Sequence, residues 1–398
     1  MSGATLSLPV SRPRASIDAW VLGGGAALFA GLVGAAMAQP GATWRMAALV
    51  MVGGAIGAVL LRTTFGFAGA FRALIEHRDG SGLRAHAVML ALATVLMLPL
   101  LAMGEVWGMK LNGGVTPVGV GFAVGALLFG AGMQVGGGCA SGTLFSLGGG
   151  NARLIGTLLG LVVGSAIGAA HMGFWWSLPA LPGATAQGLV GTGPALILQL
   201  GALGLLFWVA GRGRLRVAGG LRARLAAVPV LVWGGLALAL LNVATLVLSG
   251  KPWGETSAFA LWGSKAAVAL GIDAHGWAYW QRPGFNTQLD RGVLLDTTSV
   301  MDGAILLGAA MAAAAAGVFR PHRGGNARAW AGALLGGIAM GYGARLSNGC
   351  NIGAYFSAIA AGNLSGWAWM ALALAGSWIG VQMRPLFSLS GRTSGPVC

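Results

Sequence analysis

Charged side chains are scarce in this sequence. Asp, Glu, Lys and Arg together make up 8% of the 398 residues, whereas soluble domains carry about 25%. Hydrophobic residues make up 56% of the chain, so the few charges cannot cover the surface of a globule in water. A water-soluble globular protein is therefore excluded.

Acidic residues are the rarer charged class. The chain has 9 Asp and Glu against 24 Lys and Arg, which gives a formal net charge of +15. A basic balance can indicate nucleic-acid binding, but that requires basic residues gathered on a polar face or domain. Here the basic residues lie at the ends of apolar runs, as the positive-inside bias of membrane proteins predicts. Nucleic acid is therefore not expected as a partner.

Cysteine and histidine are also few, with 3 and 5 copies. A zinc or iron–sulfur site needs clustered Cys and His ligands, and no histidine lies within ten residues of Cys139 or Cys350. The third cysteine, Cys398, ends a polar tail and is interpreted as incidental. We therefore expect no metal site and no cofactor.

Long runs without any charge dominate what is present. About 20 apolar residues cross the hydrocarbon core of a membrane as a helix. The polar first 19 residues have no small-residue cleavage pattern, so we expect the first apolar stretch to remain as a helix. We predict an all-α polytopic membrane protein with about nine to ten transmembrane helices, near residues 20–37, 46–61, 86–103, 118–135, 152–171, 194–210, 229–248, 303–319, 328–344 and 365–383.

Arginines indicate how these helices are oriented. Short loops rich in Arg and Lys stay in the cytoplasm. Three connections are rich in arginine and are predicted to face inward, whereas the uncharged segment 173–193 is predicted to face outward. The arginines in question are Arg62, Arg72, Arg78, Arg84, Arg212, Arg214, Arg216, Arg222, Arg224, Arg320, Arg323 and Arg328.

A motif of seventeen residues occurs twice, each time between two apolar spans. Residues 130–146 read GAGMQVGGGCASGTLFS and residues 341–357 read GYGARLSNGCNIGAYFS, which share the pattern GxGxxxxxGCxxGxxFS. A fainter pair, FGFAGAF and WGETSAF, precedes them. We predict a single transmembrane domain over residues 1–398, with pseudo-repeats at about 46–172 and 229–387.

The two copies are expected to run in opposite directions, because the equivalent spans lie five crossings apart. Inverted repeats with glycine-interrupted segments at matching positions indicate a transporter's binding site near the middle of the bilayer. The charge bias predicts that the Cys139 hairpin enters from the cytoplasm and the Cys350 hairpin from outside. Their re-entrant short helices would bring the two thiols to one pathway.

The glycines around each cysteine favour a broken helix that binds an anion. Three consecutive glycines before Cys139 would each weaken a helix by about 1 kcal/mol relative to Ala, and a helix that restarts there presents free N–H groups and a positive dipole end. Close backbone approach makes four further glycines candidate substrate-binding residues beside the two cysteines. They are Gly138 and Gly142 in the first motif, and Gly349 and Gly353 in the second.

Charged residues near the motifs give weaker indications. Arg345 could attract an anion or only anchor a helix end, and the sequence leaves both alternatives open. Charges at membrane depth are functional candidates, so Lys251 and Lys265 are considered, whereas Glu255 would repel a dianion unless paired. Asp302 lies at the edge of a span and is expected at the membrane interface.

Together with the segments RTTFGFAGAFR and KPWGETSAFALWG, the two Cys hairpins resemble the YeeE/YedE sulphur-transport family from about residue 46 to 387. The resemblance implies an hourglass-like fold in the bacterial inner membrane and uptake of thiosulfate along cysteine thiols, here Cys139 and Cys350. It also implies a cytoplasmic sulfur-carrier or sulfurtransferase partner. One departure concerns the first hairpin, where Gly66 occupies the position of a third pathway cysteine.

Three classes of function compete. The first is a permease for thiosulfate or a related sulfur-containing anion. The second is a membrane sulfurtransferase that carries persulfide on Cys139 or Cys350. A nucleophilic cysteine usually needs a base or cation nearby, and no His, Asp or Glu lies close in either repeat. The third is a structural subunit that does not need the cysteines. We therefore predict a transporter and not an enzyme.

Overall fold

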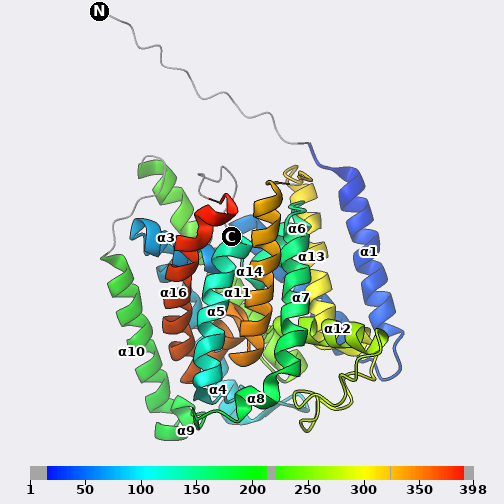
Figure 1. Ribbon diagram of the computed structural model, residues 1–398. Coiled ribbons are helices and arrows are strands. Elements are labelled where there is room, and N and C mark those ends of the chain that lie inside the picture. Colours follow the sequence, from blue (N-terminus) through cyan, green and yellow to red (C-terminus); the bar gives the residue numbers. More distant parts are fainter. Residues whose placement is uncertain (1–15, 213–220, 323, 390–398) are drawn as a thin grey trace, which may run out of the picture.

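A computed structural model describes residues 16–212, 221–322 and 324–389, with only the backbone described for 221–229. Cys398 and the arginines at 214, 216 and 323 lie outside these residues, as do the side chains of Arg222 and Arg224. The regular secondary structure of the described chain is helical except for two short two-stranded ladders. Most helices lie side by side along one direction (Figure 1).

Ten helices overlap the ten predicted spans. They are α1 (Ala19–Met37), α2 (Trp44–Thr63), α4 (Ser81–Met103), α5 (Val120–Gly136), α7 (Leu154–Ala170), α10 (Thr192–Gly211), α11 (Leu221–Ser249), α13 (Thr297–Ala315), α14 (Ala327–Leu346) and α16 (Ser365–Met383). Within the described ranges, seven apolar helical segments are long enough to cross a membrane, and α7 is a shorter apolar helix. The chain is therefore an all-α polytopic membrane protein, as predicted.

Shorter elements lie between these helices. They are α3 (Phe67–His77), β1 (Glu105–Val106), β2 (Met109–Lys110), β3 (Val118–Gly119), α6 (Ala140–Gly148), α8 (Met172–Trp176), β4 (Ala180–Leu181), α9 (Ala186–Val190), α12 (Thr256–Ala269), η1 (Val293–Leu295), the π-helix η2 (Asn351–Ser357), α15 (Ala358–Ala360) and η3 (Arg384–Phe387). β1 pairs antiparallel with β2, and β3 with β4. In Figure 1, α3 and α6 lie toward the upper end, and α12 toward the lower end.

The helices pack in matching pairs. Helix α7 packs against α14, and α16 packs against α5. In the same way α2 packs against α13, and α4 against α11, while α5 and α14 contact each other directly. Exchanging α2, α4, α5 and α7 with α11, α13, α14 and α16 reproduces the same set of contacts.

Glycines set the close approach of these pairs. A Cβ atom added at Gly376 of α16 would overlap the carbonyl oxygen of Leu127 on α5, and one added at Gly130 of α5 would overlap that of Ala373. Small residues let membrane helices approach backbone to backbone. Helix α1 is different, because a Cβ at its Gly31 would contact nothing. Much of the glycine content therefore serves packing of the central helices.

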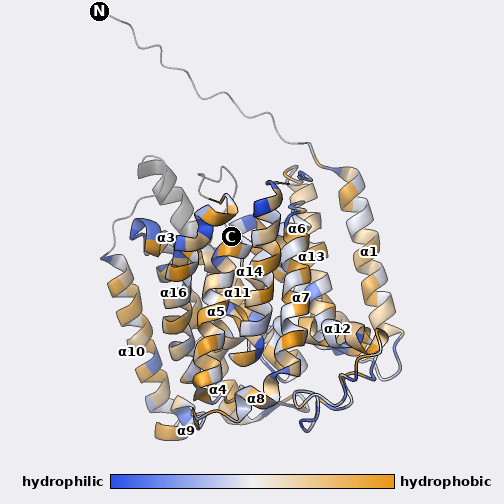
Figure 2. Cartoon of the chain, in the orientation of Figure 1, coloured by the Kyte–Doolittle hydropathy of each residue, from blue (hydrophilic) through white to orange (hydrophobic). Residues whose placement is uncertain are grey.

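Hydropathy separates the helical middle of the molecule from its two ends (Figure 2). At the upper end, the loops before α7 and before α14 are joined, since the backbone of Ala152 bonds to His322 and that of His322 to Gly150. The lower end carries α8, α9 and the loop between α12 and α13. The apolar middle is as expected for helices that cross a bilayer.

Candidate functional site

Cys139 lies at the start of a helix that restarts inside the bundle. As the three glycines predict, α5 ends at Gly136, Gly137 has a positive φ of 92°, and α6 begins at Ala140. The Cys139 side chain caps α6, where its Sγ accepts the Gly142 N–H at 3.4 Å and lies 3.3 Å from the Ser141 hydroxyl. The thiol is thus held at the free N–H groups of a helix N-terminus.

The first hairpin also contacts Cys139 through α3. Gly66 is the N-cap of α3, and the backbone N–H of Ala68, two residues later, points to the Cys139 thiol. Gln134 of α5 donates to the Ala68 carbonyl oxygen at 3.1 Å. The two short helices of the first half therefore begin side by side, and three predicted residues, Gly66, Cys139 and Gly142, lie together.

Cys350 occupies the equivalent position in the second half. Helix α14 ends at Leu346, the backbone turns through Asn348 and Gly349, which both have positive φ, and Cys350 is the N-cap of η2. The N–H groups of Ile352 and Gly353 lie near its sulfur, but unlike the Cys139 sulfur it accepts no cap hydrogen bond. Unlike α6, η2 is a π-helix, a form found often at functional sites.

Both thiols belong to one buried cluster. Each cysteine is 1% exposed, and the cluster includes aromatic residues of both halves. Tyr355 of η2 lies at its centre, with its ring 6.2 Å from that of Phe67 and stacked at 6.3 Å on that of Trp369. The structure thus brings the two motif cysteines into the same interior region.

An acidic residue beside Cys350 was not expected. Glu255, the residue before α12, is 1% exposed, and the Cys350 thiol donates to its Oε2 at 3.9 Å. Its other oxygen has no hydrogen-bond partner within the described chain, and its charge is within range of the Cys139 thiol as well. The expectation that no base lies near either cysteine was therefore wrong for Cys350, because the partner is 95 residues away in sequence.

Asp302 was expected at the membrane interface, and this expectation was wrong. The residue lies one and a half turns into α13, is 0% exposed, and neither carboxyl oxygen has a hydrogen-bond partner in the described part of the chain. It lies within electrostatic range of Glu255. Neighbouring helices pack against α13 and cover its start. The sequence of a single span cannot indicate which helices lie beside it.

The lysines considered near the hairpin do not reach the thiols. Lys251 is exposed, and Lys265 donates to the carbonyl oxygen of Leu289.

His86 is a residue that sequence reasoning missed. Its ring is buried and packs on Phe65 and Phe67, the two residues on either side of Gly66, at centroid distances of 5.3 and 4.7 Å. His86 lies on α4, outside both cysteine motifs, so the sequence of the motifs did not indicate this contact.

Arg345 lies between the Cys350 region and the lower end of the molecule. It is 8% exposed, and it donates to the hydroxyl of Tyr279 at 2.6 Å and to that of Thr256 at 2.9 Å. Thr256 directly follows Glu255, which accepts from the Cys350 thiol, so Arg345 bonds to the residue next to the partner of Cys350. The guanidinium does not contact either thiol directly.

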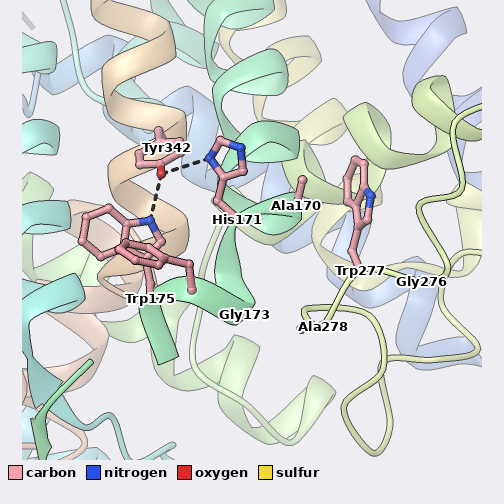
Figure 3. A pocket seen from close by; sticks show the side chains of 9 residues that line it. Ala170, His171, Gly173, Trp175, Gly276, Trp277, Ala278 and Tyr342 are labelled. Carbon is pink, nitrogen blue, oxygen red and sulfur yellow. Dashed lines mark hydrogen bonds between the residues drawn. The ribbon is translucent and has the colours of Figure 1, made fainter. Parts of the chain in front are cut away.

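Two cavities open at this end. One of about 560 Å³ lies between α8, α14 and the loop after α12, where the hydroxyl of Tyr342 accepts from Trp175 at 2.8 Å and lies 3.3 Å from His171 (Figure 3). The other, of about 370 Å³, shares Trp175 with it and is lined by the buried Arg345 and the exposed Asn348, among others. We call this second cavity the outer vestibule.

Comparison with known proteins identifies the family. The family described as Sulphur transport matches residues 62–379. The thiosulfate transporter TsuA of Spirochaeta thermophila is 27% identical over 351 residues, which cover 83% of this chain and 96% of that protein. The probable transporter YedE of Escherichia coli is 27% identical over 156 residues, 39% of this chain and 38% of that protein. Since the family match extends over most of the chain, the protein belongs to the sulphur transport family.

Proposed function

We propose that the protein imports thiosulfate or a related sulfur-containing anion across the bacterial inner membrane, along a central path lined by Cys139 and Cys350. The observation that carries this proposal is the presence of two helix N-termini, each with a cysteine at its N-cap position, in one buried cluster. The similarity to a thiosulfate transporter over most of both chains supports the choice of substrate.

The chemistry of the thiols suits such an anion. A buried anion needs several converging donors, because one helix terminus contributes only about 0.3 to 2 kcal/mol and one charge-assisted hydrogen bond about 1.5 to 3 kcal/mol. Each motif offers backbone N–H groups beside a thiol, through Gly142 and Gly353. A thiol is polarizable and can donate or accept, which suits a ligand with a sulfur atom on its surface.

The arrangement of the path follows from an inverted repeat, which we include in the proposal. Its first half, about 46–172, would place α3 and α6 at the cytoplasmic end, and its second half, about 229–387, would place α12 and η2 at the outer end. The matching helix contacts support this assignment, as does the position of α3 and α6 opposite α12 in Figure 1. The remaining predicted glycines, Gly138 and Gly349, form the turns that precede the two thiols.

Uptake of labelled thiosulfate in bacteria that lack their own importers tests the proposal. We expect Cys139→Ala and Cys350→Ala each to lower uptake about tenfold or more, the effect of one lost charge-assisted contact, because alanine has no donor for the anion. Cys398→Ala, which removes the third thiol, is the matched control and should leave uptake unchanged. Full uptake by both motif variants at equal membrane levels would refute the path.

The Glu255 contact favours testing a second function, a membrane sulfurtransferase with persulfide on Cys350. A carboxylate within reach of a thiol can act as its base. Intact mass of the purified protein after exposure to a persulfide donor distinguishes the two functions. A stable gain of one sulfur atom, absent from Cys350→Ser, would support the enzyme, whereas an unchanged mass together with uptake supports the transporter.

A further inference from the structure

The outer vestibule contains two arginines without acidic partners. Arg282, from the loop after α12, and Arg345, from the end of α14, both line this cavity, together with Thr116, Trp176 and Asn348. Among the described residues, no carboxylate lies within 4.0 Å of either guanidinium. Two positive charges therefore line a cavity, and an anion bound in this cavity could neutralise them.

Arg282 is fixed by aromatic rings and not by a counter-ion. Its guanidinium carbon lies 4.1 Å from the ring centroid of Phe285, 4.5 Å from that of Tyr279 and 5.1 Å from that of Trp176. Its Nε donates to the Tyr279 carbonyl oxygen at 3.2 Å. Burial lowers the pKa of Arg282, the Tyr279 phenol raises it, and the positive charge of Arg345 lowers it. The two guanidiniums therefore repel each other across the vestibule.

Arg345 is similarly held by neutral groups. Its Nη1 donates to the Tyr279 hydroxyl and its Nη2 to the Thr256 hydroxyl. Its buried Nε has no hydrogen-bond partner in the described residues. Tyr279 thus contacts both arginines, through its carbonyl oxygen and its hydroxyl. A charged ligand could add to this arrangement without breaking an ion pair.

We propose that the outer vestibule is a separate binding site for a small divalent oxyanion, held between Arg282 and Arg345 before it reaches Cys350. The inference rests on the proposed direction of uptake and deepens it. The vestibule contains no thiol, so it recognises charge and size and not sulfur. Sulfate should therefore occupy it as well as thiosulfate does, whereas the thiols farther in act on what has already entered.

Binding and uptake together test this site. Binding of labelled thiosulfate to the full-length purified protein is measured by equilibrium dialysis, for the unmodified protein and for Arg282→Gln. The matched control is Arg291→Gln, which changes the same charge on an exposed residue of the same loop. We expect Arg282→Gln to weaken binding about tenfold or more, because a charge-assisted contact is lost, and Arg291→Gln to bind as before.

Transport kinetics supply the second readout. In cells or vesicles, Arg282→Gln should raise the KM for thiosulfate by a similar factor and leave the maximal rate within about twofold, since only an interaction made before the transport step is removed. Unlabelled sulfate should compete with thiosulfate for the unmodified protein, and less so for Arg282→Gln.

Outcomes for the site and for the proposed function are separable. Equal binding by Arg282→Gln and Arg291→Gln would overturn the vestibule site, even if thiosulfate is transported. Binding that depends on Arg282 in a protein that transports no thiosulfate would uphold the site and overturn the function. Weaker binding by both arginine variants alike would show a general effect of surface charge and would also overturn the site.

Discussion

Glu255 is the residue whose role follows least from the sequence. It is buried at the start of α12, contacts the Cys350 thiol and has no ion-pair partner within the described residues. Two unit charges 4 Å apart repel each other by about 4 kcal/mol at an effective dielectric constant of 20. A negative Glu255 would therefore oppose the passage of a dianion past Cys350. We therefore expect its contribution to transport to be an oxygen that accepts a hydrogen bond from the Cys350 thiol.

Glu255→Gln is accordingly expected to retain thiosulfate uptake within about threefold. A threefold change in rate corresponds to about 0.6 kcal/mol, which is within the net contribution of one neutral hydrogen bond. The amide keeps an acceptor oxygen and carries no charge. Glu255→Ala should lower uptake more, because the thiol loses its acceptor. Uptake rates at equal membrane levels give the comparison. Complete loss in the Gln variant would mean that the negative charge itself is required, and would favour the base of a sulfurtransferase.

At the scale of the element, the crossing of α5 and α16 depends on glycine. Gly376 of α16 and Gly130 of α5 each face a backbone carbonyl of the other helix, and a Cβ at either position would overlap it. The same holds for α7 and α14, where Gly164 faces Ile338 and Gly341 faces Leu161. These four helices carry or adjoin both cysteine hairpins, so their spacing sets the position of the thiols.

Gly376→Ala should therefore destabilise the protein by about 1 to 3 kcal/mol, the usual cost of overpacking. Gly31→Ala, the same change in α1 where a Cβ meets nothing, is the matched control and should be neutral or slightly stabilising, since Ala favours a helix over Gly by about 1 kcal/mol. Thermal unfolding in detergent measures both. Equal melting temperatures for the two variants would contradict a close crossing.

At the scale of the whole molecule, charge differs between the two ends. The upper end of Figure 1 carries Arg78 after α3, Arg153 before α7 and Arg320 after α13. The positive-inside rule therefore predicts that this end faces the cytoplasm. An interior-negative potential then opposes uptake of a dianion by about 4.6 kcal/mol per 100 mV, twice the value of about 2.3 for one charge. A co-transported cation, or a cytoplasmic sulfurtransferase that consumes the anion, would offset this cost.

Labelling of introduced cysteines tests the orientation. In a variant without the three native cysteines, Ser177→Cys on the exposed lower loop should react in intact cells with a maleimide that does not cross membranes. His322→Cys, exposed at the upper end, should react only after the cells are permeabilised. Labelling of both residues in intact cells, or the reverse pattern, would contradict the orientation and with it the direction proposed for the path.

The sequence predicted the spans well and the surroundings of the thiols poorly. Lipid requires about 20 apolar residues for each crossing, so all ten predicted spans overlap helices, and three glycines were enough to predict the break before Cys139. Glu255, Asp302 and His86 were misjudged because burial depends on which helices lie alongside. Their neighbours come from other helices, and no period or local motif encodes such contacts.

The backbone contact between α5, α14, α16 and α7 has a consequence for the cell. Helices that touch at glycine leave little room for water, and in the buried cluster the Tyr355 ring stacks on that of Trp369 and meets the Phe67 ring edge-on. We therefore expect the protein in this conformation to block the leakage of ions between the two compartments. Many copies can then reside in an energised membrane without draining its proton or sodium gradient while they wait for a solute.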